Sequence, residues 1–256
     1  MKSMRRLVAS AAVCATLTTP VWAQSDEGAL RAAVASPDRT AAFVARDAAR
    51  HPVAELGFFG VKPSDTVIEI WPGGGYWTQI LMPYLQDHGH YIAALPPAEK
   101  DAASFRAEFP AAATTVLGSG HYTIAPDASV DAVLTFRNLH DWMETGEASR
   151  VLAGFFAALR PGGILGIEDH RARTDAPQDP SAASGYVRQD YAIALIEHAG
   201  FIFVGSSEID ANPRDTTHWP KGVWTLPPVF ALGDKDRARY AAVGEADNFV
   251  LLFRKP

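Results

Sequence analysis

Short strand-like runs alternate with helix-like runs along most of this chain, and no other feature of the sequence constrains the fold as strongly. The strand-like runs are apolar, and the helix-like runs repeat apolar residues with a period near 3.6. Strands are predicted at residues 66–70, 90–95, 114–118, 130–136, 164–169, 201–209 and 248–254, and helices at residues 39–51, 76–87, 97–109, 146–160 and 185–200. This alternation predicts an α/β fold with a mostly parallel sheet between two layers of helices.

The last two strands break this pattern. Residues 201–209 and 248–254 have no clear crossover helix between them, so these strands are expected to pair antiparallel. The intervening insertion, at about 211–246, carries Trp219 and Trp224 among several prolines. Aromatic side chains on such a loop either close over a flat ligand or cover an exposed sheet edge, and the sequence leaves both possibilities open.

The first residues of the chain have the layout of a secretory signal peptide. A basic head precedes an apolar stretch at residues 7–17, and small residues precede a cleavage site expected after Ala23. We therefore expect a periplasmic or secreted protein with a signal peptide at 1–23, a flexible segment at 24–37 and a single domain at 38–256. The apolar stretch is short for a membrane span, so no stable membrane insertion is expected after cleavage. An uncleaved membrane anchor is the alternative.

Charge and cysteine content limit the partners and the chemistry. The formal net charge is -6, and it falls to about -9 once the three basic residues of the signal peptide are removed. An acidic chain without a basic stripe is unsuited to nucleic acid, so a small-molecule substrate is expected. The single cysteine, Cys14, lies in the signal peptide, and no disulfide is expected in the mature chain. The sequence does not determine the oligomeric state.

A glycine-rich turn follows the first predicted strand, in the stretch VIEIWPGGGYWT at residues 67–78. An acid, Glu69, lies at the end of this strand, and Trp71 follows it. The turn then leaves the backbone without side chains at Gly73, Gly74 and Gly75. A helix beginning near Tyr76 would point free N–H groups and a positive dipole end at this space, which suits a carboxylate. A tight turn without any ligand is the alternative.

Polar side chains follow the fourth and fifth predicted strands. The fourth strand is followed by Arg137, Asn138, His140 and Asp141, and the fifth ends in Glu168, Asp169 and His170. His140 is the candidate general base because the pKa of an imidazole lies near neutral pH. Asp141 could orient this imidazole or bind a ligand itself, Arg137 could hold an acidic substrate, and Asn138 could donate a hydrogen bond. Alternatively, Asn138 and Asp141 cap the next helix while His140 fills a buried slot.

The two polar groups are expected to converge, because the carboxyl ends of neighbouring parallel strands meet at one edge of a sheet. Asp169 and His170 should then lie across from His140 and Asp141. Histidines and carboxylates brought together in this way could bind a divalent metal, for which Asp141, Asp169 and His170 are the candidate ligands.

Four stretches, in this order and spacing, resemble the class I S-adenosylmethionine-dependent methyltransferases. They are VIEIWPGGG (67–75), APDASVDAVLTF (125–136), LRPGGILGIED (159–169) and LIEHAGFIFV (195–204). The resemblance covers about residues 38–254 and is closest to uncharacterised predicted methyltransferases that carry signal peptides. It implies a Rossmann-like, doubly wound sheet of seven strands, mostly parallel with an antiparallel last strand.

The resemblance also implies an activity. An exported enzyme would transfer a methyl group from S-adenosylmethionine to an oxygen or nitrogen of a small molecule. The residues matching the family's cofactor positions are Glu69, Trp71, Gly73, Gly74, Gly75, Tyr76 and Ser119, and those matching its catalytic loop are Arg137, Asn138, His140 and Asp141. Some O-methyltransferases hold magnesium with acids after the fourth and fifth strands, but the spacing here does not reproduce their motif.

The chain departs from the family pattern around the adenosine half of the cofactor. Trp71 stands where the family has its first motif glycine. Ala94 and Leu95 stand where an acid usually holds the ribose, and Ser119 stands where an aspartate often contacts the adenine. A second hypothesis follows, in which the fold has lost S-adenosylmethionine binding. The protein would then be a periplasmic ligand-binding protein or a metal-assisted lyase or hydrolase.

Overall fold

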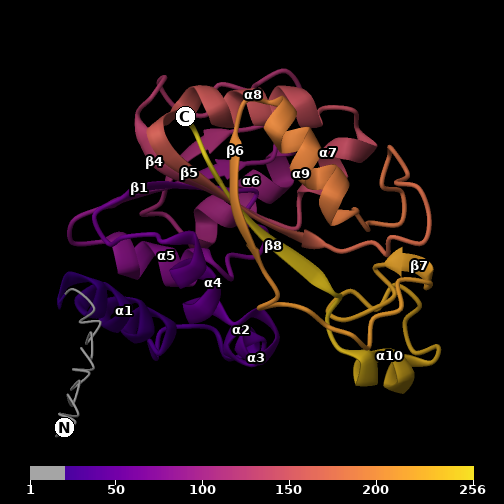
Figure 1. Cartoon of the computed structure of the whole chain (residues 1–256). Coiled ribbons are helices and arrows are strands. Elements are labelled where there is room, and N and C mark those ends of the chain that lie inside the picture. Colours follow the sequence, from indigo (N-terminus) through magenta and orange to yellow (C-terminus); the bar gives the residue numbers. More distant parts are fainter. Residues whose placement is uncertain (1–20) are drawn as a thin grey trace, which may run out of the picture.

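The computed structural model describes residues 21–256, and a seven-stranded sheet forms its centre (Figure 1). The strands are β1 (Thr66–Ile70), β2 (His90–Leu95), β3 (Ala113–Val116), β4 (Val130–Phe136), β5 (Leu159–His170), β6 (Ile202–Ser207) and β8 (Asn248–Arg254). They lie in the order β3-β2-β1-β4-β5-β8-β6, and only β8 runs antiparallel to its neighbours. The predicted α/β class, with a Rossmann-like, doubly wound sheet and an antiparallel last strand, is confirmed.

Helices cover both faces of this sheet (Figure 1). They are α1 (Val21–Val34), α2 (Ala41–Val44), α3 (Asp47–Arg50), α4 (Pro52–Phe59), α5 (Thr78–Leu85), α6 (Glu99–Glu108), α7 (Leu139–Glu144), α8 (Ala148–Ala158), α9 (Gln189–His198) and α10 (Arg237–Val243). Helices α7, α8 and α9 pack on one face, and α1, α4 and α5 pack on the other. Among the residues described, no helix combines the length and the apolar character needed to cross a bilayer.

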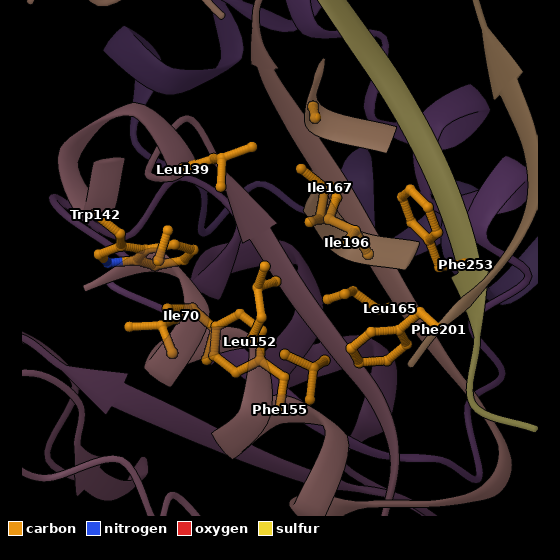
Figure 2. Close-up of a cluster of buried hydrophobic side chains, with 14 of the residues drawn as sticks. Ile70, Leu139, Trp142, Leu152, Phe155, Leu165, Ile167, Ile196, Phe201 and Phe253 are labelled. Atoms are coloured by element: carbon orange, nitrogen blue, oxygen red, sulfur yellow. The ribbon is translucent and has the colours of Figure 1, made fainter. Parts of the chain in front are cut away.

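The two layers of helices follow from the period of two along each strand. In β1, Val67 faces the layer of α1, α4 and α5, whereas Ile68 and Ile70 face the layer of α7, α8 and α9. Figure 2 shows the second of these cores, in which Trp142 of α7 and Phe155 of α8 lie among aliphatic side chains. Both rings are fully buried, so each face of the sheet has its own apolar core.

The predicted flexible segment at 24–37 is wrong for most of its length. Helix α1 continues through Val34, and its side chains Leu30 and Ala33 are buried against α4 and α5. The segment looks polar and small in sequence, but it is rich in alanine, which favours helix, and a few apolar contacts are enough to fix it. The predicted signal peptide falls mainly on residues 1–20, which lie outside the described residues.

The predicted helix at 39–51 is divided into two short helices, α2 and α3. The backbone N–H of Arg46 donates to the carbonyl of Phe43, an i to i+3 bond that ends α2. Arg39 then forms a bidentate pair with Asp47, with N–O distances of 2.7 and 2.8 Å. The hydroxyl of Tyr76 donates to the same carboxylate at 2.6 Å. These bonds hold α3 beside the glycine turn, which places Arg50 of this helix and Arg46 just before it at the end of β1.

The insertion at about 211–246 folds around one buried carboxylate. Asp215 accepts hydrogen bonds from the hydroxyl of Tyr186, the indole of Trp219 and the backbone N–H of Asp247. The insertion also forms strand β7 (Pro220–Val223), helix α10 and a small apolar core that includes Tyr240. It lies at lower right in Figure 1, next to the start of β8.

Candidate active site

A cavity of about 250 Å³ lies at the carboxyl ends of β1 and β4. This is where the strand order reverses, the position at which doubly wound sheets bind their ligands. We call it the glycine-turn cavity, and its lining includes Phe43, Arg46, Arg50, Glu69, Trp71, Gly73, Gly74, Tyr76, Arg137 and Asn138. Most of the predicted cofactor residues therefore converge, and three that the sequence did not indicate join them: Phe43, Arg46 and Arg50.

The glycine turn offers bare backbone to this cavity at two of its three glycines. The N–H groups of Gly73 and Gly74 have no backbone partner among residues 21–256, which leaves them free to meet a carboxylate. Gly75 does not line the cavity. A Cβ at Gly75 would lie 2.4 Å from the ring of Phe109, so packing inside the protein requires this glycine. Helix α5 begins at Thr78, two residues later than expected.

Glu69 is fixed in the wall of this cavity. Its Oε2 accepts a hydrogen bond from the hydroxyl of Thr78 at 2.9 Å and another from the hydroxyl of Tyr91 at 2.6 Å. Burial raises the pKa of Glu69 to about 7, although both hydrogen bonds oppose the rise. Oε1 has no partner among the described residues, so Glu69 is a rigid group that either accepts or donates a hydrogen bond near neutral pH.

Trp71 closes the other end of the cavity. Its indole N–H donates to the carbonyl of Leu117 at 3.1 Å, and its ring meets that of Trp142 edge to face at 5.5 Å. An added Cβ at Gly118 would lie 3.4 Å from the same indole. The backbone of Trp71 has a φ of 45°, the left-handed region that favours glycine. The indole therefore lies over the ends of β2 and β3, in a conformation that suits the family's glycine.

The neighbouring strand ends provide no carboxylate. Ala94 and Leu95 are buried in two different apolar cores, and Ser119 is an exposed turn residue that does not line the cavity. The residues present therefore fit the amino-acid half of S-adenosylmethionine better than its adenosine half. Free N–H groups, arginines and a carboxylate suit an amino-acid end, whereas the indole of Trp71 lies over the ends of β2 and β3, where the resemblance places ribose and adenine.

A second cavity, of about 270 Å³, lies at the ends of β4 and β5 and is covered by the insertion. We call it the His140 cavity, and its lining includes His140, Asp141, His170, Trp224, Pro227, Pro228, Val229 and Glu245. Arg46, Arg50 and Arg137 line both cavities, so these three side chains form the partition between them.

His140 is oriented by Asp169. Its Nδ1 lies 2.8 Å from Oδ1 of Asp169, and its backbone N–H donates to Oδ2 at 3.0 Å. Burial alone would lower the pKa of His140, but the Asp169 carboxylate raises it to about 8. The sequence suggested Asp141 for this role, but Asp141 lies on the other side of the ring, 3.5 Å from Nε2, and is half-exposed. Nε2 is therefore the ring atom that meets a ligand.

The expected convergence with His170 is confirmed, and hydrogen bonds within the protein already engage the cluster. The ligand atoms of His140, Asp169 and His170 lie within 4.8 Å of one another. Both oxygens of Asp169 already accept hydrogen bonds, one of them also from the N–H of His170 at 2.7 Å. Burial lowers the pKa of His170 to about 3, and its Nδ1 lies 2.7 Å from the amide oxygen of Asn248. A metal at Asp169 would share this carboxylate with the hydrogen bonds that orient His140.

The remaining predicted residues of this loop are tied to the protein. The amide of Asn138 donates to the carbonyl of Ile70 at 3.0 Å and to the hydroxyl of Thr135 at 3.1 Å, which joins β1 to β4. Asn138 occupies the N-cap position of α7 without a side-chain cap bond. Arg137 lies 2.9 Å from Glu245, and its Nε lies 3.8 Å from Glu168.

The two insertion tryptophans have different positions. Trp224 lines the His140 cavity and meets the imidazole edge to face at 6.0 Å. Trp219 instead packs on Tyr240 and bonds Asp215, within the small core of the insertion. Ligand covering therefore stays a prediction for Trp224, whereas Trp219 packs within the core of the insertion and not over the edge of the sheet. Glu245 and Arg46 carry no local sequence signal, since their meeting depends on how the chain folds across nearly 200 residues.

Comparison with known proteins agrees with this architecture. Residues 69–167 match the family model described as a methyltransferase domain. A SAM-dependent methyltransferase from Aquifex aeolicus has a similar fold, with a TM-score of 0.55 and 18% identity over 89% of this chain and 97% of that one. The [4+2]-cyclase SpnF matches with a TM-score of 0.52 and 18% identity, over 80% of this chain and 82% of its own.

A ligand-bound relative has the same fold. Phosphoethanolamine N-methyltransferase 2 of Haemonchus contortus, solved in complex with S-adenosyl-L-methionine, matches with a TM-score of 0.55 and 13% identity. The match covers 81% of this chain but only 52% of that one. No curated protein matches the sequence. Residues 69–167 thus match a methyltransferase domain, and the sheet as a whole has the fold of solved S-adenosylmethionine-dependent methyltransferases.

Proposed function

We propose that this protein is an exported S-adenosylmethionine-dependent methyltransferase that acts on an oxygen or nitrogen of a small molecule in the His140 cavity. One observation carries this proposal. His140, oriented by Asp169, faces a cavity that shares three lining arginines with the glycine-turn cavity. A donor of methyl groups and an acceptor can thus lie on the two sides of one partition.

The glycine-turn cavity would hold the amino-acid end of the cofactor. The N–H groups of Gly73 and Gly74 and the guanidinium of Arg50 suit its carboxylate, and Glu69 suits its ammonium group. S-adenosylmethionine supplies, when bound, an electrophilic methyl group. Its adenosine half would lie at the ends of β2 and β3 only if Trp71 leaves the carbonyl of Leu117.

His140 would act as the general base. With Nδ1 bonded to Asp169, the neutral imidazole presents the lone pair of Nε2 to the cavity and accepts the proton of an acceptor hydroxyl or amine there. Asp169 then stabilises the resulting imidazolium, as the raised pKa of His140 indicates. Trp224 and the prolines at 227 and 228 restrict water around the reacting atoms.

Export is supported by the N-terminal sequence alone. Cleavage after Ala23 would leave most of α1, including the buried Leu30 and Ala33, so the mature chain keeps the contacts that hold this helix. The cofactor is made in the cytosol, and export of the folded, loaded protein would supply it. N-terminal sequencing of protein recovered from the periplasm tests this part, with Gln24 expected as the first residue.

A second function is favoured by Trp71. Its indole fills the adenosine side, and no carboxylate stands at Ala94, Leu95 or Ser119. The same fold would then serve a ligand-binding protein or a lyase or hydrolase, and a metal-assisted version would share Asp169 between the metal and His140. The shared fold of a [4+2]-cyclase is consistent with other chemistry on this scaffold.

Isothermal titration of the mature protein separates the two functions. Under the first, S-adenosylmethionine and S-adenosylhomocysteine both bind, and product formation with an added acceptor requires His140. Under the second, neither nucleoside binds, at any pH between 6 and 9, while the His140 cavity still takes a small ligand. Binding of a divalent metal without either nucleoside would favour the metal-assisted version.

A further inference from the structure

Three arginines converge on one carboxylate in the partition between the two cavities. Arg46 binds Glu245 through two parallel hydrogen bonds, of 2.6 Å from Nε and 2.8 Å from Nη2. Arg137 donates to Glu245 from Nη1 at 2.9 Å, and Arg50 donates from Nε at 3.3 Å. Such a set of donors in fork geometry is the arrangement with which proteins hold carboxylates and phosphates.

The arginines have more donors than Glu245 can use. Arg50 has no other carboxylate partner among the described residues, and its guanidinium lies 4.5 Å above the ring of Tyr76. Its Nη atoms have no hydrogen-bond partner there, and they are not sealed from solvent. The lining of the His140 cavity carries three guanidinium groups and two imidazoles, of which His170 is neutral, against two carboxylates, Asp141 and Glu245. This cavity is therefore electropositive, although the chain as a whole is acidic.

Glu168, the carboxylate next to Arg137, does not neutralise the positive charge of the cavity. Glu168 lies 3.8 Å from Nε of Arg137 and is fully buried. Burial raises the pKa of Glu168 to about 8, against the effect of Arg137, so much of it is uncharged near neutral pH. Glu245 is thus the principal counter-charge that the cavity itself presents to the arginines.

Glu245 lies on the insertion, and its side chain extends from there to the three arginines. It follows Gly244, which has a φ of 89° and a ψ of -166°, a combination essentially restricted to glycine. The carbonyl of Glu245 accepts a hydrogen bond from the amide of Asn212 at 2.7 Å. The backbone is therefore anchored while the side chain alone spans the cavity, so the carboxylate can leave by side-chain rotation.

The opposite wall of the His140 cavity is apolar. It is formed by Trp224, Pro227, Pro228 and Val229, and Val229 is 56% exposed. A flat or apolar body fits between this wall and the imidazole of His140, with its charged end toward the arginines. The cavity thus has a cationic end that suits an anion, an apolar wall and a base.

We infer that the ligand of the His140 cavity is a small apolar or aromatic oxyanion whose carboxylate or phosphate displaces Glu245 from Arg46, Arg50 and Arg137. The identification of this ligand as the methyl acceptor rests on the proposed function, but its binding does not. In the structure, the carboxylate of Glu245 occupies the place of the ligand's anionic group.

The test is isothermal titration of the mature protein with benzoate, phenyl phosphate and benzamide as probes. Benzoate and benzamide have the same shape and differ in charge, so benzoate is expected to bind at least tenfold more tightly. The ratio of phenyl phosphate to benzoate affinity distinguishes phosphate from carboxylate as the preferred group. Equal affinity for benzoate and benzamide would overturn the inference.

Substitutions in the partition test whether benzoate binds in the His140 cavity. Glu245→Gln removes the competing carboxylate and should tighten benzoate binding about tenfold, whereas Arg46→Gln should weaken it about tenfold. Glu208→Gln, which removes an exposed carboxylate from another part of the surface, is the matched control and should change nothing. Unchanged benzoate affinity in a folded Glu245→Gln protein would contradict the inference. If that variant lacks a thermal transition, the benzoate and benzamide comparison on the unmodified protein decides.

The outcome is separable from that of the proposed function. Benzoate binding in the absence of any S-adenosylmethionine binding would support the anion site and remove the methyltransferase proposal. Binding of S-adenosylmethionine with no preference for benzoate over benzamide would do the reverse.

Discussion

The two ends of the glycine-turn cavity differ in what they offer a ligand. At one end, the N–H groups of Gly73 and Gly74, the guanidinium of Arg50 and the carboxylate of Glu69 face open space. At the other end, the indole of Trp71 is bonded to Leu117 and leaves no comparable opening. One end is polar and open, and the other is aromatic and filled.

This difference shows how a fold can be retained while a site changes. The backbone at position 71 still has the left-handed conformation that suits the family's glycine, but the side chain there fills the cleft. Recognition of an amino-acid carboxylate needs only backbone N–H groups and cations, and those remain. Recognition of a nucleoside needs specific side chains at two strand ends, and those are absent among the described residues.

The largest expected effect concerns the catalytic step and not ligand binding at either end of the glycine-turn cavity. Replacing His140→Gln should lower turnover by about 10²- to 10⁴-fold, because no other side chain in the His140 cavity has a free imidazole nitrogen oriented by a carboxylate. The affinity for S-adenosylmethionine should stay within about twofold, since His140 does not line the glycine-turn cavity. Turnover is measured as S-adenosylhomocysteine formation and affinity by calorimetry. Turnover equal to that of the unmodified protein would remove His140 from the mechanism.

The polar end is tested by Arg50→Gln. Loss of a charged donor should weaken the binding of S-adenosylmethionine by roughly 10- to 100-fold, the usual effect of a lost charge-assisted hydrogen bond. Arg173→Gln is the matched control, because Arg173 is an exposed arginine paired with Asp175 outside both cavities. Equal affinities of the two variants would show that the polar end does not hold the cofactor.

The filled end is tested by Trp71→Gly, which restores the family's residue. We expect S-adenosylmethionine to bind about tenfold more tightly, because the adenosine half no longer has to displace an indole. The affinity for L-methionine should not change. The melting temperature should fall, because the edge-to-face contact with Trp142 and the bond to Leu117 are lost. Weaker cofactor binding in a folded variant would mean that the indole contacts the ligand instead of excluding it.

The smallest expected effect is the pH dependence of turnover. Because the pKa of His140 is raised to about 8 by Asp169, the base is mostly protonated at pH 7, and turnover should rise by about threefold between pH 7.5 and 8.5. The ion pair stabilises the fold fully below the unfolded pKa of about 6.5, and this stability is lost as the pH rises through about 8. Asp169→Asn should move the rise in turnover to lower pH. A pH–rate profile that is flat from 7 to 9 would contradict this assignment.

Much of the fold could be predicted from the sequence, because it depends on local patterns. The alternation of apolar strands and amphipathic helices sufficed for the sheet, its two layers and the antiparallel β8. Helix α1 escaped prediction because its stability comes from the burial of Leu30 and Ala33 on α4 and α5, a tertiary contact that composition does not reveal.

The sequence predicted only those site residues that lie at the end of a strand or shortly after it. His140, Asp169 and His170 were expected to converge on that ground, and they do. The orienting acid was harder to choose, since Asp141 is adjacent in sequence while Asp169 has the hydrogen-bond geometry. Arg50 and Glu245 lie on segments far apart in the chain that meet only in the folded protein, so no spacing rule could have paired them.

The most direct test of this account compares L-methionine with adenosine as ligands of the mature protein. Each is titrated calorimetrically, and S-adenosylmethionine serves as the reference. If the polar end of the glycine-turn cavity holds the cofactor and the filled end does not, L-methionine binds at least tenfold more tightly than adenosine. Adenosine binding as tightly as S-adenosylmethionine, with no measurable binding of L-methionine, would contradict the account.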